Sequence, residues 1–147
     1  MSKKKVIISA CLLGEYCRYD GKTKALNEII EAHKDYEIIP FCPEAPLFGT
    51  PRQRISLVKK DSTIRVVTDE TNEDVTEILK DEINSFISEN QEADKIVLKS
   101  KSPSCGLGTT PILNQKKEIE GYADGIAASI FKNYYSSVKI EDEKVYL

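Results

Sequence analysis

Cysteine is the residue type in this chain with the most specific chemistry, and it occurs at positions 11, 17, 42 and 105. None of the four belongs to a Cys-x-x-Cys pair, so spacing alone favours neither a zinc knuckle nor a thioredoxin-like site. The N-terminus carries three lysines without the longer apolar run of a secretion signal, and no segment approaches the length of a membrane span. We therefore expect a cytoplasmic protein whose reduced thiols bind metal or react, with no membrane partner and no disulfide framework.

Three of the cysteines follow short apolar segments that are typical of strands buried on both faces: residues 5–10, 36–41 and 95–98. Cys11 and Cys42 come directly after the first two segments, and Cys105 lies in the loop after the third. In a parallel sheet, ligands gather beyond the carboxyl ends of the strands. If these strands are neighbours, the three thiols can converge at one edge of the sheet.

A free cysteine is often simply buried, and this is the alternative for each of the three taken alone. Their joint placement in loops with small or kinked residues favours a site instead, because such loops let backbone N–H groups approach a bulky anion. Those residues are Leu13-Gly14, Pro43, Pro103-Ser104 and Gly106.

Three thiolates suit an iron–sulfur cluster better than zinc, although ligand type by itself does not separate the two. A four-iron cluster usually has four thiolate ligands, so three would leave one iron open to a substrate. Cys17, six residues after Cys11, is an alternative fourth ligand that would close the site and make it an electron-transfer centre. The other interpretation of Cys17 is a packing role or a place near the mouth of the site.

Candidate catalytic groups accompany two of these cysteines. Glu44 follows Cys42 in a Cys-Pro-Glu sequence, and near a cluster it could transfer protons, whereas its ordinary alternative is a solvated loop acid. Ser102 and Ser104 precede Cys105, and their hydroxyls could bind a substrate carbonyl or cap the following turn. For Ser104 we expect capping.

Other polar residues have less specific interpretations. Arg18 and Asp20 are expected to brace their loop as an ion pair, while Arg52 and Arg54 could bind an anion or a planar ring. His33, the only histidine, lies on the apolar face of a predicted helix, so we expect packing and no Cys–His nucleophile. Neither Gly-x-Gly-x-x-Gly nor a phosphate-binding loop is present, which counts against nucleotide cofactor chemistry.

The elements that would position these residues alternate along the chain. Helical spacing of apolar residues predicts helices over 26–33, 72–89 and 124–134, the second capped by Thr71 or Asn72. Segments 55–58 and 63–67 predict short strands or a hairpin. This order predicts an α/β fold of three layers, with a mostly parallel, Rossmann-like sheet covered by helices on both faces.

Composition limits the number of domains and the kind of partner that we expect. With 147 residues and 40% hydrophobic content, the chain suits one domain over 1–147. The net charge of −3 argues against binding nucleic acid through bulk electrostatics. A small molecule is therefore the expected partner.

Four motifs in order, covering nearly the whole chain, resemble the thiouracil desulfidase family. They are Ser-Ala-Cys-Leu-Leu-Gly from Ser9, Cys-Arg-Tyr-Asp-Gly from Cys17, Cys-Pro-Glu from Cys42, and Lys-Ser-Pro-Ser-Cys-Gly from Lys101. The resemblance implies a [4Fe-4S] cluster bound by three cysteines, with the substrate sulfur taken up by the fourth iron and lost without net redox change. It assigns the ligands to Cys11, Cys42 and Cys105, and it places Glu44 and Ser102 beside the substrate.

The resulting hypothesis is hydrolysis of the C–S bond of a thiolated base or nucleoside such as thiouracil. The open iron binds the thiocarbonyl sulfur, water attacks the carbon, Glu44 acts as general acid and base, and Ser102 orients the substrate. One alternative keeps the cluster but makes the chain a sulfur carrier in nucleoside thiolation. Another is a non-catalytic metal-binding or redox-sensing module, in which Cys17 closes the site.

Overall fold

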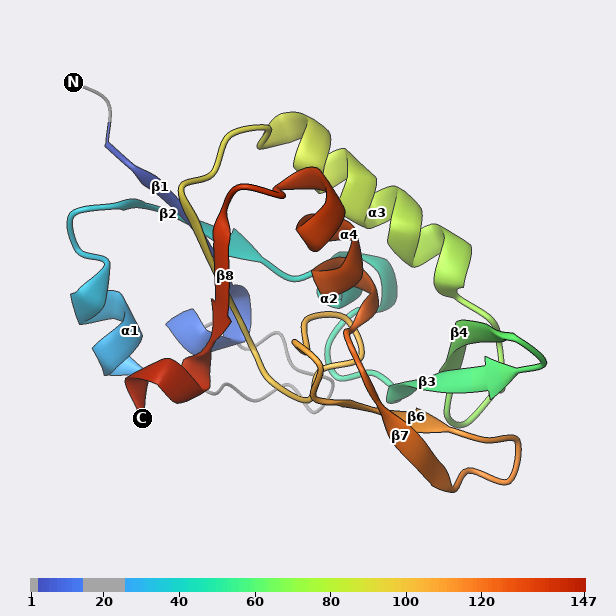
Figure 1. Ribbon diagram of the computed structural model, residues 1–147. Helices are drawn as coiled ribbons and strands as arrows, with labels where there is room; N and C mark the ends of the chain where they lie inside the picture. The colour runs from blue at the N-terminus through green and yellow to red at the C-terminus, as the bar shows by residue number, and fades with distance from the viewer. Residues whose placement is uncertain (1–2, 15–25) are drawn as a thin grey trace.

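The computed structural model describes residues 3–14 and 26–147, which form two four-stranded sheets with helices packed against them (Figure 1). This arrangement confirms the predicted α/β class. Cys17, Arg18 and Asp20 lie outside the described residues, so the expectations for them stay predictions. No helix in the described part of the chain is long and apolar enough to cross a membrane.

The first sheet has the strand order β2-β1-β5-β8, and all three pairings are parallel. Its strands are β1 (Lys5–Ser9), β2 (Glu37–Phe41), β5 (Lys95–Leu98) and β8 (Lys139–Asp142). Alternate residues of β1 point to opposite faces, as the pleat of a strand requires: Ile7 packs in one apolar cluster, and Val6 and Ile8 pack in another. Both faces are covered, which explains the continuous apolar run.

Helices cover the two faces of this sheet in different ways. The longer helices α3 (Thr76–Glu89) and α4 (Ile126–Tyr134) pack on the face that contains Ile7. The short helix α1 (Asn27–Ala32) and the 3-10 helices η1 (Ala10–Leu13) and η2 (Glu143–Tyr146) contribute to the cluster on the other face. The predicted three layers are therefore confirmed for the first sheet.

The second sheet has the order β4-β3-β6-β7 and mixes parallel with antiparallel pairs. Its strands are β3 (Ile55–Lys60), β4 (Thr63–Thr68), β6 (Thr110–Leu113) and β7 (Ile119–Ala123). The predicted hairpin is confirmed as β3 and β4, whereas β6, β7 and β8 were not predicted. Leu57 and Val66 of this sheet pack against Leu79 of α3, which joins the second sheet to the first.

The predicted start of α3 is wrong by about one turn, since the helix begins at Thr76 and neither Thr71 nor Asn72 caps it. Asn72 adopts a left-handed φ of 56°, and Asp74 forms a bridge with Val67 that keeps this segment beside β4. Arg65 of β4 holds Asp74 at 2.7 Å, and their hydrogen bond is the main cause of a pKa of Asp74 well below its usual value. Tertiary contacts therefore place the start of α3 later in the sequence than the residues that could cap it locally.

His33 has the packing role that its position predicts. It is fully buried at the end of α1, and its Nδ1 donates to the backbone carbonyl of Ile29 at 2.7 Å. Its ring packs edge-on against Tyr36 and Tyr146. A donor satisfied by its own helix and a ring enclosed by aromatic residues are features of a core histidine.

Candidate active site

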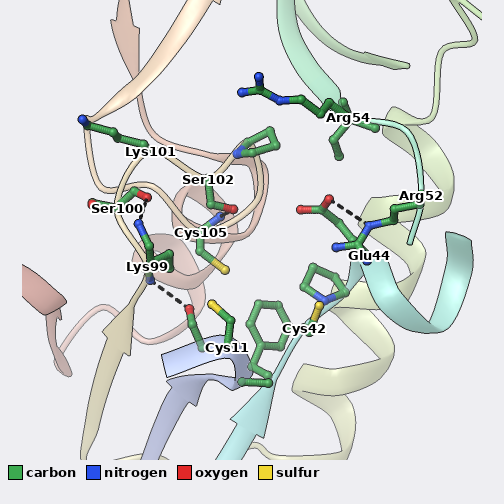
Figure 2. Close-up of a pocket in the computed structure, with 16 residues that line it drawn as sticks. Cys11, Cys42, Glu44, Arg52, Arg54, Lys99, Ser100, Lys101, Ser102 and Cys105 are labelled. Atoms are coloured by element: carbon green, nitrogen blue, oxygen red, sulfur yellow. Dashed lines mark hydrogen bonds and ion pairs between the residues drawn. The ribbon is translucent and has the colours of Figure 1, made fainter. Parts of the chain in front are cut away.

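The structure brings three predicted ligand residues, Cys11, Cys42 and Cys105, to the wall of one cavity of about 420 Å³. Cys11 lies in η1 directly after β1, Cys42 follows β2, and Cys105 lies in the loop after β5. Figure 2 shows Cys11 and Cys42 in the lower part of the cavity, at the ends of their strands, and Cys105 in the loop above them. Adjacent parallel strands end at the same edge, which is why positions so far apart in sequence meet here.

Cys11 and Cys105 are buried, and Cys42 is half-buried. The Sγ of Cys42 accepts a hydrogen bond from the backbone N–H of Ala45 at 3.5 Å, so the start of α2 approaches the sulfur. Burial is the main cause that raises the pKa of the Cys105 thiol to about 12, although hydrogen bonds with Ser9 and Ser102 oppose it. A thiolate at position 105 therefore needs a positive partner, which a metal ion would provide.

The loop that carries Cys105 is fixed from within by Ser102. Its Oγ accepts hydrogen bonds from the N–H groups of Ser104 at 3.1 Å and Cys105 at 3.0 Å, and its carbonyl accepts from Gly106 at 2.9 Å. Thr110 donates to the same carbonyl at 2.5 Å. The capping that we expected of Ser104 is therefore performed by Ser102, and that expectation for Ser104 is wrong.

The same loop is also held by α4. The N–H of Ile126 donates to the carbonyl of Pro103 at 3.0 Å, and the N–H of Ala127 donates to that of Ser104 at 2.8 Å. Gly125 makes this approach possible, because a Cβ at its position would lie 2.5 Å from the Ser104 carbonyl carbon. The start of α4 thus fixes the backbone beside Cys105.

The base of the loop is anchored by Glu143 of η2. Its carboxylate accepts from the N–H of Ser100 at 2.7 Å and from the Ser100 hydroxyl at 2.9 Å, and it pairs with Lys99 Nζ at 3.1 Å. Burial opposes ionisation of Glu143, but these hydrogen bonds outweigh it, and the pKa lies below the usual value for a glutamate. A buried anion from the far end of the sequence therefore supports the wall of the cavity.

Glu44 lines the same cavity as the first residue of α2 (Glu44–Phe48) and is buried, so it is not a solvated loop acid. Its Oε2 accepts from the Ser104 hydroxyl at 2.8 Å, and its Oε1 lies 3.5 Å from Nε of Arg52. From the sequence we expected Arg52 to bind an anion or a planar ring, but we did not pair it with Glu44. No short-range signal could have paired Glu44 with Ser104, because the two residues are 60 positions apart in the sequence.

Cationic side chains line the outer part of the cavity. Arg54 and Lys101 are exposed and lie on opposite sides of its mouth, while Lys99 is part of the Glu143 anchor (Figure 2). The site therefore combines three cysteine side chains, a buried carboxyl group and positive charge at its entrance. This combination suits a polar ligand that enters and reacts beside the cysteines.

Comparison with known proteins identifies the family of this chain. The sequence model of the 2-thiouracil desulfurase family matches residues 6–143. The protein YbbK of Bacillus subtilis (strain 168), described as uncharacterized, is 31% identical over an alignment of 150 residues that covers 94% of this chain and 96% of YbbK. The solved structure of TudS, a [4Fe-4S]-dependent thiouracil desulfidase, matches with a TM-score of 0.72 at 29% identity, covering 97% of this chain and 92% of TudS. The family resemblance of the motifs is thus confirmed, and this chain belongs to the 2-thiouracil desulfurase family.

Proposed function

We propose that this chain is a desulfidase that removes sulfur from a thiolated nucleobase or nucleoside, such as thiouracil, and releases sulfide without net redox change. The observation that carries this proposal is the meeting of three cysteines from three strand ends with a buried carboxyl group in one cavity. Membership of the 2-thiouracil desulfurase family supports the substrate class. The expected cytoplasmic location and the organisation of residues 1–147 as one domain belong to the same proposal.

Cys11, Cys42 and Cys105 would hold the [4Fe-4S] cluster. In the described part of the chain, no group of three or more His, Cys, Asp or Glu side chains is placed to bind a single metal ion. Thiolates are the usual protein ligands of iron–sulfur clusters, and they bind separate irons of a cluster, so the three cysteines fit such a group. When bound, a cluster with three protein thiolates supplies an iron with an open position, which acts as a Lewis acid toward the substrate sulfur.

Glu44 would move the protons in this reaction. Replacement of C=S by C=O consumes one water and releases hydrogen sulfide, so a base must take a proton from the attacking water and an acid must return it. Glu44 lines the cavity with a carboxyl group that can perform both steps. Its partners Ser104 and Arg52 hold that group beside the loop of Cys105.

Ser102 would orient the substrate. Its oxygen accepts from two backbone N–H groups, and a hydroxyl has one proton to donate. That hydroxyl is hydrogen-bonded to the Cys105 thiol, and a carbonyl oxygen of the substrate ring is the other acceptor that it could serve in the cavity. Substrate and ligand contacts can therefore share one fixed hydroxyl.

Anaerobic reconstitution with iron and sulfide tests the proposal, with iron content, the visible spectrum and sulfide release from 2-thiouracil as the measurements. We expect about four irons per chain, the number in a cubane cluster, and release of free sulfide. Serine variants of Cys11, Cys42 and Cys105 should each lose iron, whereas the matched control Cys17→Ser should keep it. Glu44→Gln should keep its iron and lose most of its turnover.

Three outcomes would overturn the proposal. Full iron content in a Cys105→Ser variant would reject the ligand set. Loss of iron in Cys17→Ser would favour the closed metal or redox module. Stoichiometric transfer of sulfur to an acceptor, without free sulfide, would favour the sulfur carrier.

A further inference from the structure

Within the proposed function, on which this step rests, we infer that Ser104 and Arg52 are positioning residues that fix the orientation of the Glu44 carboxyl group. Among the described residues, Ser104 donates to Oε2 of Glu44 at 2.8 Å, and Nε of Arg52 lies 3.5 Å from Oε1. The two partners come from different segments, one from the loop of Cys105 and the other from the segment between α2 and β3. A carboxyl group held at both oxygens cannot rotate freely about its last bond.

Ser104 is a rigid support. It is fully buried, and its carbonyl accepts from the N–H groups of both Ala127 and Ala128 of α4. Its own N–H donates to Ser102 Oγ, and Gly125 packs against its backbone. With its backbone fixed in this way, the Ser104 hydroxyl gives Oε2 of Glu44 a defined place.

Arg52 is the partner of Oε1, the other oxygen of the Glu44 carboxyl group. Its side chain is only 5% exposed, and its Nη1 donates to the carbonyl of Gly49 at 2.9 Å. Its Nε has no hydrogen-bond partner among the described residues, and Oε1 of Glu44, at 3.5 Å, is the acidic oxygen paired with it. A buried guanidinium is costly unless it is paired, and Glu44 provides a carboxylate beside it.

The geometry of the three side chains explains how they act on the reaction. In Figure 2, Glu44 lies between Arg52 and the loop that carries Ser102 and Cys105. Arg52 and Ser104 therefore keep the carboxyl group turned toward the cavity, where its remaining lone pairs can meet a water or a ring N–H. Neither residue needs to touch the substrate. Misplacement of a reacting group by about 1 Å can reduce a rate by about a hundredfold, so the loss of either support should affect turnover.

Double-mutant cycles with Glu44→Gln test this inference. Ser104→Ala and Arg52→Met should each lower kcat for 2-thiouracil on the order of ten- to hundredfold, with iron content and KM unchanged. Arg52→Lys, which keeps the charge, should recover part of the loss. In a Glu44→Gln background, neither Ser104→Ala nor Arg52→Met should lower the residual kcat further, because the group that they position is already gone. Arg65→Met, outside the cavity, is the control and should leave kcat unchanged.

A second readout is independent of the cluster. In urea unfolding of the metal-free protein, Ser104→Ala should lower the midpoint in the wild-type background and have a smaller effect in the Glu44→Gln background. Additive effects on both kcat and the midpoint would overturn the positioning roles. If the reconstituted wild type releases no sulfide, the proposed function fails, and the unfolding cycle alone decides whether the three side chains are coupled.

Discussion

Replacement of Gly125 by alanine should damage the site through steric contact alone. The Cβ would lie 2.5 and 2.6 Å from the carbonyl carbon and oxygen of Ser104 and 2.9 Å from the Cys105 nitrogen. All three atoms belong to the backbone, so no side-chain rotation can relieve the contact. The φ of −63° and ψ of 163° at Gly125 are accessible to alanine, so conformational strain adds nothing to the effect.

The expected loss of stability follows from these contacts. Overpacking by one methyl group typically costs about 1–3 kcal/mol. Here the shift would also lengthen the hydrogen bonds from Gly125 to the Gly106 carbonyl and from Ala127 to the Ser104 carbonyl, each of which contributes about 1 kcal/mol. We therefore expect a loss of about 3 kcal/mol, the upper part of the range. With a urea slope of about 2 kcal/mol per molar, the unfolding midpoint should fall by about 1.5 M.

Urea unfolding of Gly125→Ala and of the control Gly121→Ala measures this difference. A Cβ at Gly121 would meet nothing within 4 Å, so the control should change stability by less than about 0.5 kcal/mol. After reconstitution, Gly125→Ala should also contain less iron than the control, because its clash displaces the loop of Cys105. Equal midpoints for the two variants would refute the conclusion that α4 fixes this loop.

Three further predictions concern the anchor, the core and the start of α3. Glu143→Gln should lower the free energy of unfolding at pH 7 by about 2 kcal/mol, through weaker hydrogen bonds from the loop. Because the folded-state pKa of Glu143 is lowered, the stability difference between variant and wild type should be complete above the unfolded pKa of about 4.3. It should be lost as the pH falls from there through the lowered folded-state pKa. A pH-independent difference in urea titrations would contradict this reasoning. Phe131→Ala, in the centre of the core, should cost about 3–5 kcal/mol in thermal or urea unfolding, whereas Ile119→Ala on the exposed edge strand should cost much less. Thr76→Val should cost about 1–3 kcal/mol, because it removes the buried acceptor of the Val66 N–H at 2.8 Å, and hydrogen exchange at Val66 should then become faster.

Three strands of the first sheet, β1, β2 and β5, and the convergence of the cysteines could be predicted because they depend on local signals. Strands such as β1 and β5 are buried on both faces, so they are continuous apolar runs that sequence alone reveals. A cysteine directly after such a strand must lie at the carboxyl edge of a parallel sheet. The roles of these cysteines as ligands remain proposals.

The strands that sequence analysis missed have weak signals for clear reasons. β8 reads Lys-Ile-Glu-Asp and is an edge strand with one apolar residue. β6 contains Pro111, and β7 contains Gly121, both of which are unfavourable in strands. Their pairing depends on partners such as β3, far earlier in the chain.

The residues that support Glu44 could not be identified from local sequence patterns either. The sequence shows three polar residues in three separate loops, and only the packing of α4 against the loop of Cys105 places Ser104 at hydrogen-bond distance from Glu44. Arg52 had a general interpretation as an anion-binding residue, but its burial depends on the surrounding tertiary structure. Side-chain roles that depend on such distant contacts need a structure.

The parallel pairing of β1 with β5 also bears on how the protein matures. Val6 pairs with Lys95, so this central contact cannot form until most of the chain has left the ribosome. Non-local pairings of this kind form slowly, because a long loop must close first. A nascent chain therefore displays Cys11 and Cys42 well before Cys105 can join them. Short zinc modules acquire metal while they fold, whereas the proposed cluster would have to be delivered after folding, when the finished sheet presents all three thiols together.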